Sequence, residues 1–138
     1  MADGEKAFHL SVLTPDGVPL DTQAVYVSVP AALGSLGVLY NHAPLITPVD
    51  IGVMKVRYPD GRTLYYAAGD GVLDIKNNEV TLLADFLNER GEVDIERAKQ
   101  ALARAKQRLA ERRADTDFIR AEAAMRRAMV RLRLAEMS

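Results

Sequence analysis

The last third of the chain, residues 94–138, contains neither glycine nor proline. Both residue types interrupt helices, so their absence over this length favours helical structure. Apolar residues at 95–109 and again at 118–135 recur at alternating steps of three and four, which places each set along one stripe of a helix. Asp115 and Asp117, in the polar segment between the two sets, are typical helix-start residues. We therefore predict two helices folded against each other as a hairpin.

The seam between these two helices is narrow and rich in alanine. Its members are Ile95, Ala98, Leu102, Ala105 and Leu109 on the first helix, and Phe118, Ala121, Met125, Ala128, Leu132 and Ala135 on the second. A fully buried leucine contributes about 1.5–3 kcal/mol and an alanine much less, so such a seam holds two helices together weakly. We therefore expect the hairpin to need a second surface, and to be able to choose between two.

Residues 1–90 instead contain short stretches of alternating apolar and polar residues, separated by turn residues. Turns every 8–12 residues are typical of an antiparallel sandwich or barrel. The predicted strands are 7–13, 24–29, 51–58, 62–68, 72–75 and 79–84. Pro30 is expected to end the second strand, because proline lacks the N–H that a ladder needs. The segment 34–48 is apolar but interrupted by glycine and proline.

A bendable joint is predicted between the β-rich body and the helices. Gly91 allows the chain to bend there. Asp94 is expected to cap the first helix, because its carboxylate can accept a backbone N–H and complement the helix dipole. The predicted organisation is a body at 1–90 and a helical unit at 91–138, without an internal repeat.

Charge is unevenly distributed along the chain. Residues 1–93 carry 12 acidic and 6 basic side chains, whereas residues 94–138 carry 7 acidic and 12 basic ones, within a net charge of −1. The cationic hairpin can be attracted to the acidic body, can bind an outside anion, or can simply be solvated. A nucleic-acid partner is not favoured, because Phe118 is the only aromatic residue of the hairpin and the chain as a whole is not basic.

The composition and motifs exclude several classes of site. The chain has no cysteine, so disulfides and thiolate metal sites are excluded. We find no secretory pattern and no apolar run near the roughly 18 residues that a membrane span requires. We therefore expect a cytoplasmic location without direct membrane insertion. Phosphate-loop, dinucleotide and zinc-protease motifs are missing, and His9 and His42 have no obvious ligand partners, so no catalytic or metal site is expected. A turn-stabilising role suits His42 better.

Three arginines of the hairpin have no acidic partner on their own helix. Neighbours on a helix lie three and four residues apart, and Arg104, Arg127 and Arg131 have neither Asp nor Glu at those spacings. Arg127 and Arg131 are four residues apart, a spacing at which like charges repel. Unpaired arginines clustered in this way suit a polyphosphate, because the guanidinium fork matches phosphate oxygens. The competing interpretation is that these long side chains extend into water.

Four motifs of the chain resemble the epsilon subunit of F-type ATP synthases, and those of thermophilic bacilli in particular. They are residues 36–45 (LGVLYNHAPL), 69–75 (GDGVLDI), 93–98 (VDIERA) and 126–132 (RRAMVRL) with 135–137 (AEM). Together they span nearly the whole chain in order. Tyr40 and Asn41 replace a proline and a glycine of the family's first motif, a departure that concerns only the turn.

The resemblance implies an α+β fold, with an N-terminal antiparallel β-sandwich at 1–90 and a C-terminal antiparallel two-helix hairpin at 91–138. It also implies a non-catalytic subunit of the central stalk, peripheral at the cytoplasmic face of the bacterial plasma membrane. Its partners would be the gamma subunit, the c-ring and the alpha/beta catalytic head. The hairpin would lie down on the sandwich or extend into the head, where it hinders ATP hydrolysis. A purely structural rotor adaptor, without nucleotide binding or inhibition, stays the alternative.

The resemblance further implies that ATP is a regulatory ligand of the folded-down hairpin rather than a required cofactor. The candidate ATP ligands are Asp94, Arg97, Ala98, Arg127 and Arg131, with Arg104 and Glu89 as weaker candidates. Asn88 stands where ATP-binding members have a glutamate, and Glu89 is the adjacent substitute. Asp94 and Arg97 can alternatively form only a helix cap and an ion pair. The candidate partner-contacting residues are His42, Arg112 and Arg113.

Overall fold

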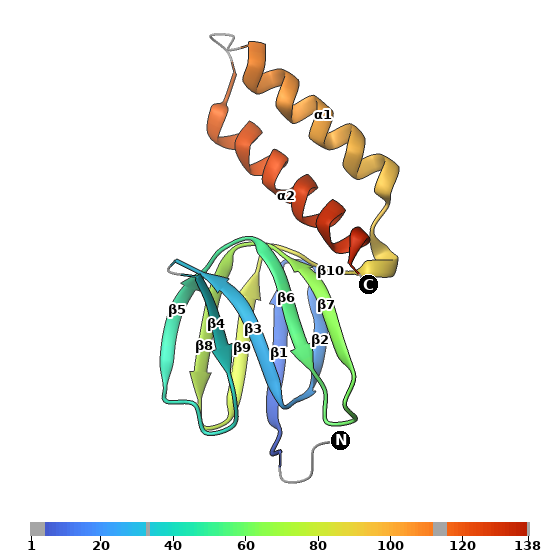
Figure 1. The fold of residues 1–138 in the computed structure, drawn as a ribbon. Coiled ribbons are helices and arrows are strands. Elements are labelled where there is room, and N and C mark those ends of the chain that lie inside the picture. Colours follow the sequence, from blue (N-terminus) through green and yellow to red (C-terminus); the bar gives the residue numbers. More distant parts are fainter. Residues whose placement is uncertain (1–4, 33, 112–115, 138) are drawn as a thin grey trace.

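A β-rich body carries a helical hairpin at one end in the computed structural model, which describes residues 5–32, 34–111 and 116–137 (Figure 1). The strands are β1 (Phe8–Thr14), β2 (Gly17–Ala24), β3 (Tyr26–Ala31), β4 (Gly34–Val38), β5 (Leu45–Val49), β6 (Gly52–Arg57), β7 (Thr63–Ala68), β8 (Gly71–Lys76), β9 (Glu79–Ala84) and β10 (Leu87–Glu89). The 3-10 helix η1 (Arg90–Glu92) and the helices α1 (Ile95–Glu111) and α2 (Phe118–Glu136) follow. The predicted fold, a β-sandwich followed by a two-helix hairpin, is confirmed.

The strands form two five-stranded sheets. The first sheet has the order β2-β1-β9-β8-β5, and the second has the order β10-β7-β6-β3-β4. Among the described strands the ladders are antiparallel except that between β1 and β9, which is parallel. The last strand, β10, leads directly into η1. The hairpin is therefore attached to the edge of the second sheet.

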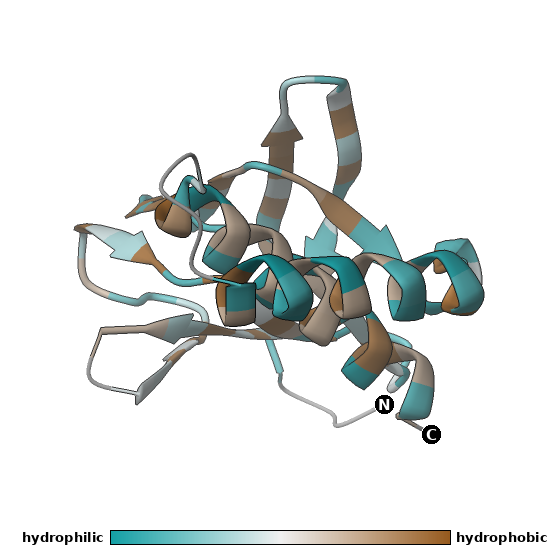
Figure 2. Cartoon of the chain, turned by 90° about the horizontal axis from the view of Figure 1, so that it is seen from above, coloured by the Kyte–Doolittle hydropathy of each residue, from teal (hydrophilic) through white to brown (hydrophobic). Residues whose placement is uncertain are grey.

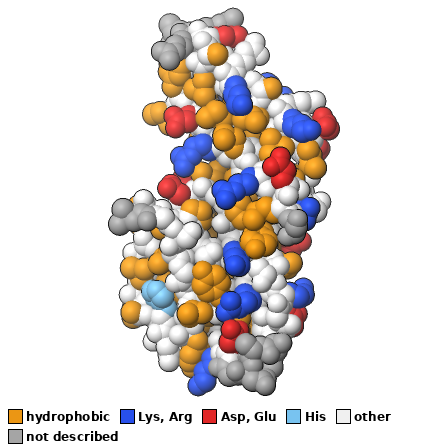
Figure 3. Space-filling view, viewed as in Figure 1, with side chains coloured by type: hydrophobic (Ala, Val, Ile, Leu, Met, Phe, Trp, Pro, Cys, Tyr) orange, Lys and Arg blue, Asp and Glu red, His pale blue; other side chains and the backbone are white. Residues whose placement is uncertain are grey.

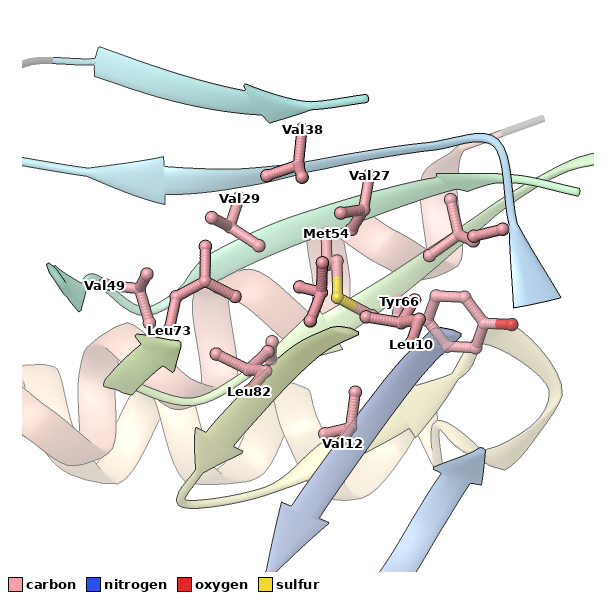
Figure 4. Packing of buried hydrophobic residues seen from close by; sticks show 14 of the residues in the cluster. Leu10, Val12, Val27, Val29, Val38, Val49, Met54, Tyr66, Leu73 and Leu82 are labelled. Atoms are coloured by element: carbon pink, nitrogen blue, oxygen red, sulfur yellow. The ribbon is translucent and has the colours of Figure 1, made fainter. Parts of the chain in front are cut away.

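The main core lies between the two sheets (Figure 4). In β1 the alternate side chains of Phe8, Leu10 and Val12 point into it and are at most 2% exposed, as the period of two predicts. Gly71, from the Gly-Asp-Gly segment, begins β8. A Cβ atom there would lie 1.6 Å from the carbonyl oxygen of Leu83, so this glycine is required by strand packing.

Four strands were not predicted, because their sequences do not alternate between apolar and polar residues: β2, β4, β5 and β10. All four are the outer strands of their sheets. An outer strand has a ladder on one side only, so it tolerates the glycine and proline that interrupt β4 and β5, and its sequence need not alternate. In β2, for example, only Ala24 is buried.

Pro30 does not end β3, contrary to the prediction, because the strand continues to Ala31. The pairing of β3 with β6 stops at Ser28. No ladder on that side therefore requires an N–H from residue 30, and proline is tolerated at such a position.

The helices pack through the predicted alanine seam, since Ala98, Ala105, Ala121 and Ala128 are buried. The first residue of each predicted stripe is less buried than these alanines: Ile95 is 45% exposed and Phe118 is 44% exposed. Seen from above, the two helices lie side by side across the end of the sandwich (Figure 2).

The hairpin rests on the body through α2, which lies between α1 and the sheets (Figure 1). A second, small apolar cluster, here called the docking cluster, forms this contact. Its buried members are Ala67, Val130 and Leu134, and its partly buried members are Ile51, Val53, Tyr65, Phe86 and Val93. Beside it, Nη2 of Arg126 lies 3.7 Å from Oδ1 of Asp50. The second surface that the weak seam requires is thus the end of the sandwich.

The helix starts follow the capping predictions. The backbone N–H of Arg97 donates to Oδ1 of Asp94 at 3.0 Å, so Asp94 caps α1. The backbone N–H of Arg120 donates in the same way to Asp117, which caps α2. Asp115 lies outside the described residues.

Candidate anion-binding cavity

A cavity of about 430 Å³ opens between α1, α2 and the joint. It is lined by Asn88, Glu92, Val93, Asp94, Arg97, Ala98, Ala101, Arg104, Ala124, Arg127, Ala128 and Arg131. Its volume falls within the roughly 300–1,000 Å³ typical of small-molecule sites. No aromatic residue is among this lining, so polar groups and small side chains define what the cavity can hold.

Each helix supplies two arginines to the cavity. Arg97 and Arg104 are two turns apart on α1, and Arg127 and Arg131 are one turn apart on α2. The residues between them on these faces are alanines, whose small side chains leave the space that the cavity occupies. The same alanines that make the seam weak therefore make room for a ligand. Basic side chains also mark the hairpin on the face seen in Figure 3.

Arg131 is the arginine with the most structural support. Its guanidinium lies 4.2 Å from the ring centroid of Phe86, and its Nε donates to Oδ1 of Asn88 at 2.9 Å. Burial lowers its pKa from the usual arginine range, and the charges of Arg127 and Arg97 lower it further. A negative ligand would offset this repulsion, since an opposite charge nearby favours the charged form.

The acidic side chains of the cavity wall already have backbone partners. Asp94 accepts the N–H of Arg97 as the cap of α1. Glu92 accepts the N–H of Glu89 at 2.7 Å and completes a capping box around η1. The described cavity wall thus combines four arginines with two carboxylates that are engaged in helix caps. This balance favours an anion.

Six of the seven candidate ATP ligands come together at this cavity. They are Asp94, Arg97, Ala98, Arg104, Arg127 and Arg131. Glu89 does not join them: it lines a different cavity of about 260 Å³, beside Tyr66 and Leu134. Asn88, one residue earlier in β10, lines the arginine cavity.

Sequence reasoning missed several residues of the wall. Ala101 and Ala124 lie three residues from Ala98 and Arg127, so helical spacing contains the signal for them. Phe86, which contacts Arg131 from outside the wall, carries no such signal, because it precedes the helices and reaches Arg131 only through the docking of α2.

The candidate partner-contacting residues lie elsewhere. Nδ1 of His42 donates to the carbonyl oxygen of Ala43 at 2.7 Å, which fits the expected turn-stabilising role. Asn41 has a φ of 63°, a left-handed conformation that asparagine tolerates better than most residues. It therefore adopts a backbone conformation in this turn that glycine also tolerates. Arg112 and Arg113 lie outside the described residues.

Two protein-family models match the chain. The first, the ATP synthase delta/epsilon chain beta-sandwich domain, matches residues 7–89. The second, the ATP synthase delta/epsilon chain long alpha-helix domain, matches residues 92–136. The ATP synthase epsilon chain of Moorella thermoacetica is 42% identical over 94% of this chain and 96% of its own length. That of Bacillus mycoides is 36% identical over 96% and 98%.

Solved structures share the fold. A chain of the Euglena gracilis mitochondrial ATP synthase, in an OSCP/F1/c-ring assembly, matches with a TM-score of 0.81 at 20% identity, over 99% of this chain and 87% of that one. A chain of the Tetrahymena thermophila central stalk and c-ring matches with a TM-score of 0.61 at 14% identity, over 95% of both chains. Neither α1 nor α2, the helices of the described ranges, is long and apolar enough to cross a membrane. The family models and bacterial relatives together establish that the chain belongs to the ATP synthase delta/epsilon family, as an epsilon chain of the bacterial kind.

Proposed function

We propose that this chain is a non-catalytic rotor subunit that joins the gamma subunit to the c-ring, and whose hairpin restrains ATP hydrolysis by the alpha/beta head. Its place would be peripheral, at the cytoplasmic face of the bacterial plasma membrane. Membership of the epsilon chains supports the stalk role. The small docking cluster supports a movable hairpin, because few apolar side chains must be exposed for α2 to leave the sandwich.

ATP is the proposed ligand of the docked hairpin. The observation that carries this proposal is the cavity in which Arg97, Arg104, Arg127 and Arg131 meet across the helix seam. Guanidinium groups bind phosphate oxygens through charge-assisted hydrogen bonds. Because both helices and β10 contribute to the wall, a ligand there would stabilise the docked arrangement over an extended one.

The expected size of this effect is sufficient for regulation. A ligand that binds only the docked state stabilises it by about 2.7 kcal/mol at 100 times its dissociation constant. That energy is comparable to the burial of one or two of the docking side chains, at about 1.5–3 kcal/mol each. ATP would therefore shift the position of the hairpin and thereby the restraint on hydrolysis.

Removal of the hairpin tests the restraint in the assembled ATPase. A chain ending after residue 90 should leave assembly intact and raise ATP hydrolysis. The matched measurement uses the full chain with Asp50 and Arg126 both replaced by cysteine and joined by a short bismaleimide, which is selective because the chain has no other cysteine. Locking the hairpin in the docked position should raise the rate of ATP hydrolysis, as deletion of the hairpin does. Unchanged hydrolysis in both would contradict the restraining role.

A purely structural adaptor is the second candidate function. Asn88 favours it, since the side chain at this wall is a neutral amide engaged with Arg131 rather than the glutamate of ATP-binding members. In that case ATP would produce no heat on titration into the isolated chain at millimolar concentration, and hairpin deletion would leave the hydrolysis rate unchanged.

A further inference from the structure

The environment of Arg131 differs from that of the other arginines in the cavity. Its guanidinium lies against the Phe86 ring at 4.2 Å, whereas the remaining cation–ring pairs of the described residues span 5.1–6.0 Å. Its Nε donates to the side-chain oxygen of Asn88 at 2.9 Å. Arginine has five N–H donors in a fixed fork. One of them is thus held by Asn88, and the Nη donors are not used in that bond.

Neither of these two supports carries a charge. A carboxylate in the place of Asn88 would fix the guanidinium as well, but would also neutralise it. An aromatic face attracts the cation through its quadrupole and an amide oxygen accepts one hydrogen bond, so both orient the group and leave its full positive charge. The negative charge of Asp85 offsets part of the cost of that charge in a half-buried site beside Arg97 and Arg127, and the rest of the cost remains until an anion arrives.

We infer that Phe86 and Asn88 form a neutral cradle that positions the Arg131 guanidinium for a polyphosphate ligand. The inference rests on the proposed ligand site and adds two positioning residues to it. Both belong to the body, whereas Arg131 belongs to α2. The cradle therefore exists only while the hairpin is docked, and it makes the affinity for the ligand depend directly on docking.

Phe86→Leu tests the cradle, because leucine keeps an apolar side chain in the docking cluster and removes the aromatic face. Tyr65→Leu is the matched control: Tyr65 belongs to the same cluster, but the Arg131 guanidinium lies over the ring of Phe86 and not over that of Tyr65. Titration calorimetry of the full chain with ATP and with inorganic tripolyphosphate should give about fivefold weaker binding for Phe86→Leu, equivalent to ~1 kcal/mol for a lost cation–π contact. Phe86→Tyr should restore the affinity, and Tyr65→Leu should keep it.

A spectroscopic signature separates positioning from mere packing. In the wild-type chain the Nε proton of Arg131 should show an upfield ring-current shift and slow exchange with solvent, both lost in Phe86→Leu and kept in Tyr65→Leu. Equal affinities for wild type and Phe86→Leu, or equal losses in both leucine variants, would overturn the cradle while the ligand site stands. If the wild type binds neither ATP nor tripolyphosphate, the ligand site and the cradle's role in it both fall.

Discussion

At the scale of single residues, Arg127 is the clearest test of the cavity. It is half-buried on the same wall as Arg131, and its charge contributes to the lowered pKa of that neighbour. A hydrogen bond to a charged group contributes about 1.5–3 kcal/mol, so Arg127→Ala should weaken ATP binding roughly 10- to 100-fold. Calorimetry of the isolated chain measures this. Arg133→Ala, an exposed arginine of α2 outside the cavity wall, should bind as the wild type does; an equal loss would indicate unspecific attraction of charge.

The buried hydroxyl of Tyr66 determines how the free energy of unfolding should change at high pH. Its hydroxyl is buried and hydrogen-bonded to that of Tyr58, and burial, followed by this bond, raises its pKa far above the ordinary value. In the unfolded chain Tyr66 should ionise near pH 10. Above that pH the folded state binds more protons than the unfolded one, so the free energy of unfolding should fall as pH rises. Urea unfolding at several pH values from 9 upwards measures the slope, and Tyr66→Phe should reduce it. An unchanged slope in that variant would contradict the assignment.

At the scale of elements, the docking of α2 depends on few side chains. Leu134 is fully buried against the end of the sandwich, whereas Met129 on the same helix is 50% exposed. Truncation of a buried leucine costs about 2–5 kcal/mol, so Leu134→Ala should release the hairpin. Hydrogen exchange should then accelerate in α1 and α2 but not in the sandwich. Met129→Ala should leave all three rates close to those of the wild type, and uniform acceleration in Leu134→Ala would indicate one cooperative unit instead.

The elements also show what the sequence can and cannot predict. Central strands such as β1, and both helices, follow from apolar periodicity, because each buries one face against a core. The outer strands β2, β4, β5 and β10 do not, since a strand with a ladder on one side only tolerates glycine, proline and exposed side chains of either kind. Three arginines of the cavity, Arg104, Arg127 and Arg131, follow from helical spacing and the lack of acidic neighbours. Arg97 does not, because Asp94 lies three residues before it, and only the family resemblance indicates it.

The docking face of α2 and the contact with Phe86 could not be predicted in this way. Val130 and Leu134 lie one turn apart, which identifies an apolar stripe but not its partner. That partner comes from β7 and from Phe86, which precedes β10, both distant in sequence. Only the packing of the hairpin on the sandwich brings these residues together.

At the scale of the whole molecule, the structure predicts two regions of unequal stability. The sandwich has a large core between two sheets, whereas the hairpin relies on an alanine seam and the docking cluster. Hydrogen exchange in the full chain should therefore be faster in α1 and α2 than in the central strands. Saturating ATP should slow exchange in the helices and β10 alone; slower exchange throughout the sandwich would contradict a ligand site at the hairpin.

Gly91 gives the joint more backbone freedom than the docked arrangement requires. A Cβ atom added there would meet no heavy atom within 4 Å, and its φ lies outside the left-handed range. Alanine would fit this backbone, and such a replacement commonly stabilises a fold by about 0.4–1 kcal/mol. Gly91 can thus adopt other backbone dihedral angles than those of the docked arrangement. Such a change would rotate the hairpin as one unit about the edge strand β10.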